Sequence, residues 1–246
     1  NTPTSEVADE VSHKATIPWA KRQFSARCHL PRCHIATGNT VHAAAKHGRI
    51  SAGLTCISRN PAMSTALRET KRWTRQQYHH AATTGVFENE KVELISGEIL
   101  VRSPMDAKHA TGIQLILQAL HAVASTDVVI RVQLPLALSV DSEPELDLSV
   151  VAGKPRDYSA EHPTTAALVV EVSHSSLRFD QTFKRRLYAS HGIPEYWILN
   201  LLDQQLEVHQ NPADGDYTDV SVYAAGAFFT SSTFPDQPIA IGDLLP

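Results

Sequence analysis

The stretch AALVVEVSHSSLRFDQTFKRRLYASHGIPEYWILNL (residues 166–201) decides the fold of this chain. Its two ends, residues 166–173 and 195–201, are short and almost wholly apolar, which is typical of strands covered on both faces. Between them, residues 178–192 have the pattern of a helix that ends at Gly192, and Pro194 separates it from the next strand. The stretch therefore predicts two buried strands with a helix between them.

Further elements are expected on both sides of this stretch, each marked by caps, turn residues or apolar periodicity. They are a helix over 74–85 with Thr74 as its N-cap, a hairpin over 91–102 that turns at Ser96-Gly97, a helix over 107–124 with Asp106 as its N-cap, a strand over 128–139, a strand over 145–151 and a closing hairpin over 206–226. Pro135 places the 128–139 strand at an edge or a bulge. Together they predict a mixed central sheet with helices packed on it, in an α/β or α+β arrangement.

Two acids interrupt these apolar strands, Asp147 in ELDLSVV (145–151) and Glu171 in AALVVEVS (166–173). An ionised carboxylate in such a place costs several kcal/mol unless it is paired, hydrogen-bonded or bound to a metal. If the strands are neighbours in suitable register, the two carboxylates lie close together, and a divalent cation would relieve their repulsion. Oxygen ligands favour Mg²⁺ or Mn²⁺. The alternative is two solvated acids at the rim of the sheet.

The predicted helix adds a polar stripe to this pair of acids. Asp180, Lys184 and Tyr188 follow one another at four-residue spacing. One interpretation is a lysine delivered beside the two carboxylates, where it would position or activate a water molecule. The other is a surface ion pair worth only ~0.3–0.5 kcal/mol.

Three blocks of the sequence together resemble one known family. They are ELDLSVV, LVVEVSHSSLRFDQTFKRRLYASHGIPEYWILNL and VELISGEILVRSPMDAKHA (92–110). Over roughly residues 70–246 the chain is similar to the Uma-two family of restriction-endonuclease-like proteins, within the PD-(D/E)XK nuclease superfamily. The resemblance implies a restriction-endonuclease-like core and assigns residues by position: Asp147 and Glu171 as the two motif acids, Lys184 as a lysine moved to the following helix, Asp180 and Tyr188 as the helix signature, and Glu93, Gly97 and His109 in the hairpin and first helix. Two departures are Leu146 in place of the usual proline and Ser173 where the superfamily has its lysine.

The resemblance implies an Mg²⁺- or Mn²⁺-dependent DNA endonuclease. In this reading Asp147, Glu171 and Glu93 would hold the metal, Lys184 would orient the attacking water or stabilise charge, and His109 would contact the phosphate or the water. Glu93 and His109 could equally be structural hydrogen-bonding residues. A homodimer is a further possibility, built on the Pro135 strand or the closing hairpin. The alternative function is an inactive nuclease-fold module that binds nucleic acid or protein.

Charge divides the chain into two regions. Of the 246 residues, 1–62 hold eight Lys and Arg against three acids, whereas 63–246 carry a net charge of −9. We expect residues 1–62 to be a poorly structured basic leader or extension and 63–246 to be the nuclease-like domain. Cys28, Cys33 and Cys56 offer loosely spaced candidates for a zinc site in the leader. The chain has no apolar run long enough for a membrane span and no secretory signal pattern, so we expect a cytoplasmic protein without a membrane partner.

Overall fold

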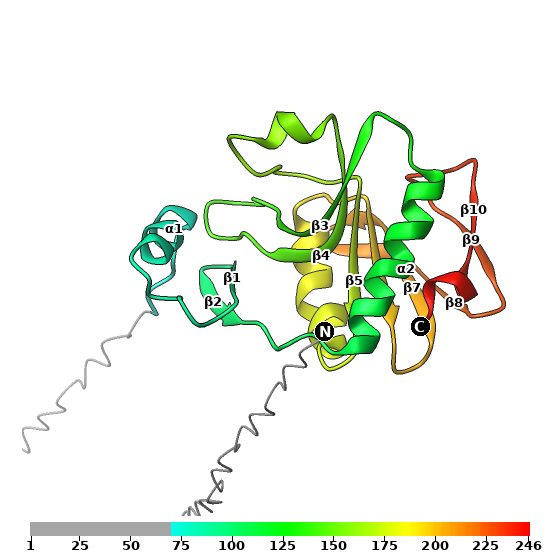
Figure 1. Cartoon of the computed structure of the whole chain (residues 1–246), viewed down its shortest axis with the longest axis horizontal. Helices are drawn as coiled ribbons and strands as arrows, with labels where there is room; N and C mark the ends of the chain where they lie inside the picture. The colour runs from blue at the N-terminus through cyan, green and yellow to red at the C-terminus, as the bar shows by residue number, and fades with distance from the viewer. Residues whose placement is uncertain (1–69) are drawn as a thin grey trace, which may run out of the picture. The chain divides into compact units, whose positions relative to one another are not determined.

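The computed structural model describes residues 70–246, and the predicted leader with its three cysteines lies outside the described residues. The described part is built on one six-stranded sheet, in the spatial order β3-β4-β5-β6-β7-β8 (Figure 1). Its strands are β3 (Val128–Pro135), β4 (Glu145–Ala152), β5 (Leu168–Ser173), β6 (Glu195–Asn200), β7 (Gln205–Ala213) and β8 (Asp216–Ala224). The predicted mixed sheet is confirmed, and β3 with its Pro135 lies at an edge as expected.

The pair β5 and β6 is parallel, and every other neighbouring pair in this sheet is antiparallel. Parallel strands need a crossover connection, which here is helical. The sequence predicts one helix over 178–192, but the structure divides it into α3 (Leu177–Phe179), a π-helical turn η2 (Asp180–Lys184) and α4 (Arg185–Ser190). The prediction of a single regular α-helix is therefore wrong at its centre, where five residues form a wider turn.

Helices cover both faces of the sheet (Figure 1). The helix α2 (Ala107–Val123) buries Ile113, Ile116 and Leu120 against Leu148, Val170 and other apolar residues of the strands. On the opposite face, α4 packs Leu187 and Tyr188 against residues such as Val169 and Ile198. Because side chains alternate along β5, Leu168, Val170 and Val172 join the α2 layer, whereas Val169 and Glu171 face α4. All six residues of β5 are buried, as expected for a central strand.

A small hairpin lies outside the main sheet. Its strands β1 (Val92–Ile95) and β2 (Glu98–Val101) turn at Ser96 and Gly97, which have φ angles of 49° and 76°. Positive φ at both central residues is the geometry of a type I′ turn, so the predicted hairpin is confirmed. An isolated bridge from Leu94 to Glu143 ties β1 to the segment that enters β4.

The remaining elements of residues 70–246 are one further helix, two short strands and two short 3₁₀ helices. The helix α1 (Arg75–Thr83) begins at the predicted N-cap, Thr74, whose side chain accepts a hydrogen bond from the backbone of Gln77. Elements not expected from the sequence are the two-stranded pair β9 (Phe228–Thr230) and β10 (Pro238–Ala240) and the short 3₁₀ helices η1 (Pro155–Tyr158) and η3 (Ile241–Leu244). Among residues 70–246, no helix has the length and apolar character to cross a membrane.

Candidate active site

The two strand carboxylates lie at one end of the β4–β5 pair. The register Leu148 to Val170, continued by one residue, brings Asp147 level with Glu171. Both side chains line a pocket of about 430 Å³, together with Glu93, His109, Asp180 and Lys184. The expectation of two neighbouring acids is therefore met in the geometry, whereas the solvated alternative is not, because both residues are buried.

Asp147 is held through only one of its carboxylate oxygens. Oδ2 accepts hydrogen bonds from the backbone N–H of Val172 at 2.9 Å and from His109 Nε2 at 3.0 Å. Oδ1 is buried and has no hydrogen-bond partner within residues 70–246, and its nearest cation is Arg102 Nη2 at 3.6 Å. A buried polar atom left without a partner is uncommon in native proteins and indicates a missing ligand or water.

Glu171 is held by two residues of the crossover helix. Lys184 Nζ donates to Glu171 Oε1 at 2.9 Å, and the Tyr188 hydroxyl donates to the same oxygen at 2.7 Å. The sequence interpretation in which Lys184 reaches the carboxylates is therefore the one that the geometry supports. Lys184 is itself buried, so this contact is not a surface ion pair.

Asp180 anchors the π-helical turn to the sheet. Its Oδ2 accepts hydrogen bonds of 2.6 Å from the hydroxyls of Ser173 and Ser176, and its Oδ1 lies 3.9 Å from Lys184 Nζ. Through its hydrogen bond to Asp180, Ser173 at the end of β5 fixes the helix that carries Lys184.

Burial and neighbouring charge shift the acid–base properties of these groups. Burial, together with the charges of Asp147 and Asp180, raises the pKa of Glu171 to about 8, although Lys184 and the Tyr188 hydrogen bond oppose the rise. For Lys184, burial alone would lower the pKa, but the surrounding carboxylates, Glu171 foremost, outweigh burial and raise it. For Asp147, burial raises the pKa, but His109, the charge of Lys184 and the backbone hydrogen bond from Val172 together outweigh burial and hold the pKa below its usual value. Asp147 and Lys184 are thus firmly charged, whereas the charge of Glu171 responds to what binds beside it.

Glu93 and His109 have contacts that explain their positions. Glu93 lines the pocket from β1 and accepts a 3.2 Å hydrogen bond from the backbone N–H of Glu145. His109 stands one turn into α2, and Asp106 caps that helix by accepting from the backbone N–H of His109 at 2.8 Å. Its Nε2 is directed at Asp147, which makes His109 a positioning residue for the carboxylate. Burial is the largest single effect on the pKa of His109 and lowers it. The hydrogen bond to Asp147, together with the negative charges of Asp147 and nearby acids, outweighs burial and raises this pKa.

Sequence reasoning missed several pocket residues. Arg102 follows β2 and forms an ion pair with Glu145, and Gln133 in β3 faces the pocket with a φ of 50°. A non-glycine residue in this left-handed region is strained, and such strain gathers at functional sites. Two basic residues elsewhere in the domain are neutralised by ion pairs, Arg185 with Asp216 and Lys154 with Asp127. No sequence signal distinguishes Arg102 or Gln133, because their roles depend on tertiary placement.

The carboxylate oxygens in this pocket are of the chemical kind that a hard divalent cation prefers. The buried, unpartnered Asp147 Oδ1 and the Glu171 carboxylate present oxygens from adjacent strands to one pocket. In the part of the chain that the structure describes, no group of three or more His, Cys, Asp or Glu side chains is arranged as a metal-binding cluster. Any cation here would therefore complete its shell with water or a substrate oxygen, as Mg²⁺ commonly does.

This mixed sheet with helices on both faces is a restriction-endonuclease-like core, with the acidic pocket at the end of its central strands. The family model of Uma2, described as "Putative restriction endonuclease", matches residues 75–242, and the chain belongs to this family. The fold is also similar to the crystal structure of a "putative nuclease belonging to DUF820" from Anabaena variabilis, with a TM-score of 0.56 and 17% identity over 70% of this chain and 97% of that one. No curated protein matches the chain.

Proposed function

We propose that the protein is a metal-dependent DNA endonuclease that hydrolyses phosphodiester bonds in the pocket at Asp147. The observation that carries this proposal is the buried Asp147 Oδ1, which accepts no hydrogen bond from residues 70–246 and shares its pocket with Glu171 and the buried, charged Lys184. Membership of the Uma2 family and the nuclease-type fold support the same conclusion.

Asp147 and Glu171 would hold Mg²⁺ or Mn²⁺, and Glu93 lines the same pocket. The bound cation would supply Lewis acidity to the scissile phosphate and a lower pKa for a coordinated water. His109 keeps Asp147 oriented through Oδ2, which leaves Oδ1 free to coordinate. Tyr188 and Lys184 both donate to Glu171 Oε1, so they fix that carboxylate in the same way.

Lys184 has a second task in this proposal. An ammonium has three donor hydrogens, and within the described chain one is used by Glu171, while Asp180 lies at 3.9 Å. The remaining donor capacity can orient the attacking water or stabilise the charge that develops on the phosphate. The raised pKa of Lys184 keeps it protonated, so it acts as a donor and electrostatic stabiliser and not as a general base.

A plasmid-nicking assay with Mg²⁺ or Mn²⁺ tests the proposal. We expect the wild-type chain to nick DNA and Asp147→Asn, Glu171→Gln and Lys184→Met to lose at least about a hundred-fold in rate, since each removes a charge that the transition state needs. Asp127→Asn is the matched control, because Asp127 is an exposed acid whose neighbour is Lys154. Wild-type cleavage that survives the three site substitutions would refute the proposed site. Binding without cleavage would favour the alternative, an inactive module of the same fold.

A further inference from the structure

Two stacked aromatic rings lie beside the candidate active site. Phe179 directly precedes the π-helical turn and Phe183 lies within it, and their ring centroids are 5.2 Å apart with planes only 6° from parallel. Phe179 is half-buried and packs against the core beneath α4. Phe183 is 42% exposed and belongs to neither of the two core clusters, so its ring has no evident part in the packing.

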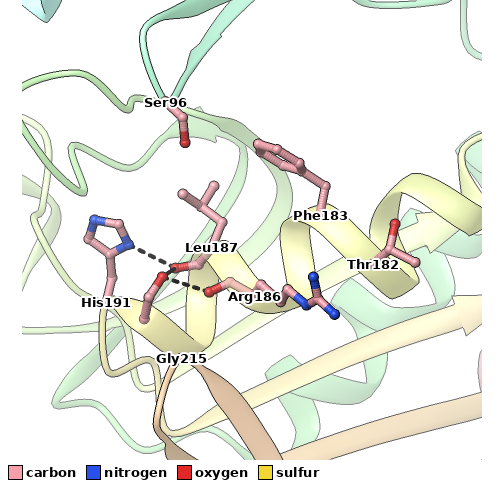
Figure 2. A pocket seen from close by; sticks show the side chains of 8 residues that line it. Ser96, Thr182, Phe183, Arg186, Leu187, His191 and Gly215 are labelled. Atoms are coloured by element: carbon pink, nitrogen blue, oxygen red, sulfur yellow. Dashed lines mark hydrogen bonds between the residues drawn. The ribbon is translucent and has the colours of Figure 1, made fainter.

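The two rings connect the catalytic pocket with a second pocket. Phe179 lines the pocket of Asp147 and Lys184, whereas Phe183 lines a neighbouring pocket of about 440 Å³. Figure 2 shows the Phe183 ring at this second pocket, with Arg186 from the same helix and Ser96 from the hairpin turn. Phe179, on which Phe183 stacks, itself lines the pocket of Lys184, so a group held at Phe183 lies close to the proposed site of hydrolysis.

The second pocket has the chemistry of a phosphate-bearing ligand. Arg186 lines it and makes no ion pair with any residue of 70–246, in contrast to its neighbour Arg185, which is paired with Asp216. Ser96 also lines this pocket, whereas the hydroxyls of Thr182 and Ser190 already donate to backbone carbonyl oxygens of their own helix. A flat exposed ring beside a guanidinium without an ion pair suits a nucleotide, whose base stacks and whose phosphate is anionic.

We propose that Phe183, supported by Phe179, is a stacking platform for an unpaired nucleobase, and that the preferred substrate is single-stranded or locally unpaired nucleic acid. This inference rests on the proposed function and adds the substrate class. In a duplex the base faces are covered by neighbouring bases, and a base reaches a protein ring only when it is unstacked. Arg186 holds the phosphate backbone of the same segment, and the adjoining phosphate enters the pocket of Asp147 and Lys184.

The test measures binding and cleavage separately. Binding is followed by the fluorescence of a 2-aminopurine placed in a single-stranded oligonucleotide and in its duplex, with Ca²⁺ in place of Mg²⁺. For Phe183→Ala we expect single-strand affinity to fall on the order of ten-fold, with a smaller effect on the duplex, and Phe183→Trp to restore it. Phe228→Ala is the matched control, because Phe228 is a 70% exposed phenylalanine on β9 outside both pockets. With Mg²⁺, the wild-type chain should cleave the single strand faster than the duplex.

The outcomes separate this inference from the function on which it rests. Equal single-strand affinity of Phe183→Ala and wild type would overturn the platform, even if Asp147-dependent cleavage is found. Loss of binding in Phe183→Ala without any cleavage by the wild type would support the platform and count against the proposed catalysis. An equal loss in Phe228→Ala would also overturn the platform, because the effect would then be one of general surface hydrophobicity.

Discussion

At the scale of single residues, the site depends on how buried charges are compensated. Glu171 is 3% exposed and would be costly as an isolated anion, yet Lys184 and Tyr188 both donate to its Oε1. Asp147 receives two donors on Oδ2 and none on Oδ1. The protein thus stabilises one carboxylate oxygen of each acid by hydrogen bonds and leaves the second oxygen available to the pocket.

The raised pKa of Glu171 predicts a pH dependence for the proposed cleavage. Below about pH 8 the free protein holds this carboxyl protonated, and a protonated acid cannot act as a metal ligand. We therefore expect the nicking rate at limiting Mg²⁺ to rise as pH increases through about 8 and then to level off. Higher Mg²⁺ should move the midpoint to lower pH, because the cation competes with the proton.

The substitution Tyr188→Phe checks whether Glu171 is the group that titrates. The Tyr188 hydroxyl lowers the pKa of Glu171 by hydrogen bonding to its ionised form, so its removal should move the midpoint of the rate profile to higher pH. Tyr223→Phe is the control, because Tyr223 lies on β8, outside the site. An unchanged midpoint in Tyr188→Phe would mean that another group sets the profile.

At the scale of elements, the side chains of the proposed site come from four elements. The strands β4 and β5 supply the acids, the crossover helix supplies Lys184 and Tyr188, and α2 supplies His109. Four-residue spacing predicts that Asp180, Lys184 and Tyr188 share one side of an α-helix, but the first interval is a π-helical turn. Such turns are frequent at functional sites, and nothing in the local sequence distinguishes this one from a regular helix.

The close approach of α2 to the sheet depends on Gly112, one turn after His109. A Cβ at this position would meet Val172 at 3.0 Å and Leu199 at 3.1 Å. Replacement by the larger valine should push the helix from β5 and lower the free energy of unfolding by ~1–3 kcal/mol in urea denaturation. Gln114→Val, an exposed position on the same helix, should change it by less than ~0.5 kcal/mol. Wild-type stability in Gly112→Val would contradict this account of the packing.

The sequence predicts the acids better than it predicts their surroundings. Asp147 and Glu171 are recognisable because each interrupts an apolar strand, and a charge in such a place needs a reason. Thr74, Asp106 and the Ser96-Gly97 turn are likewise local signals, and all three are found where expected. Arg102, Gln133 and the pair Phe179–Phe183 owe their positions to contacts between distant segments, which local patterns do not encode. The short strands β9 and β10 were missed for the same reason.

At the scale of the whole molecule, charge and family membership fall on the same part of the chain. Residues 63–246 carry a net charge of −9, and the Uma2 match over 75–242 lies within them. Within this acidic part, Asp147, Glu171 and Glu93 gather at one pocket. A bound divalent cation would cancel two of these charges where a phosphate must approach.

The same division predicts that residues 63–246 are sufficient for activity. A chain of these residues should show the same midpoint of thermal unfolding and the same nicking rate as the full 246-residue chain, because every proposed site residue lies within it. Circular dichroism and the plasmid assay measure both quantities side by side. A shortened chain that fails to fold, or folds without activity, would show that residues 1–62 contribute to the domain.

The central claim is that Asp147 and Glu171 hold a divalent cation, and Mn²⁺ titration followed by electron paramagnetic resonance tests it most directly. Above about pH 8, where Glu171 is ionised, the wild-type chain should bind one Mn²⁺ at this site. Asp147→Asn should weaken that binding by at least about ten-fold, and Asp127→Asn should leave it unchanged. Identical titration curves for wild type and Asp147→Asn would contradict the account.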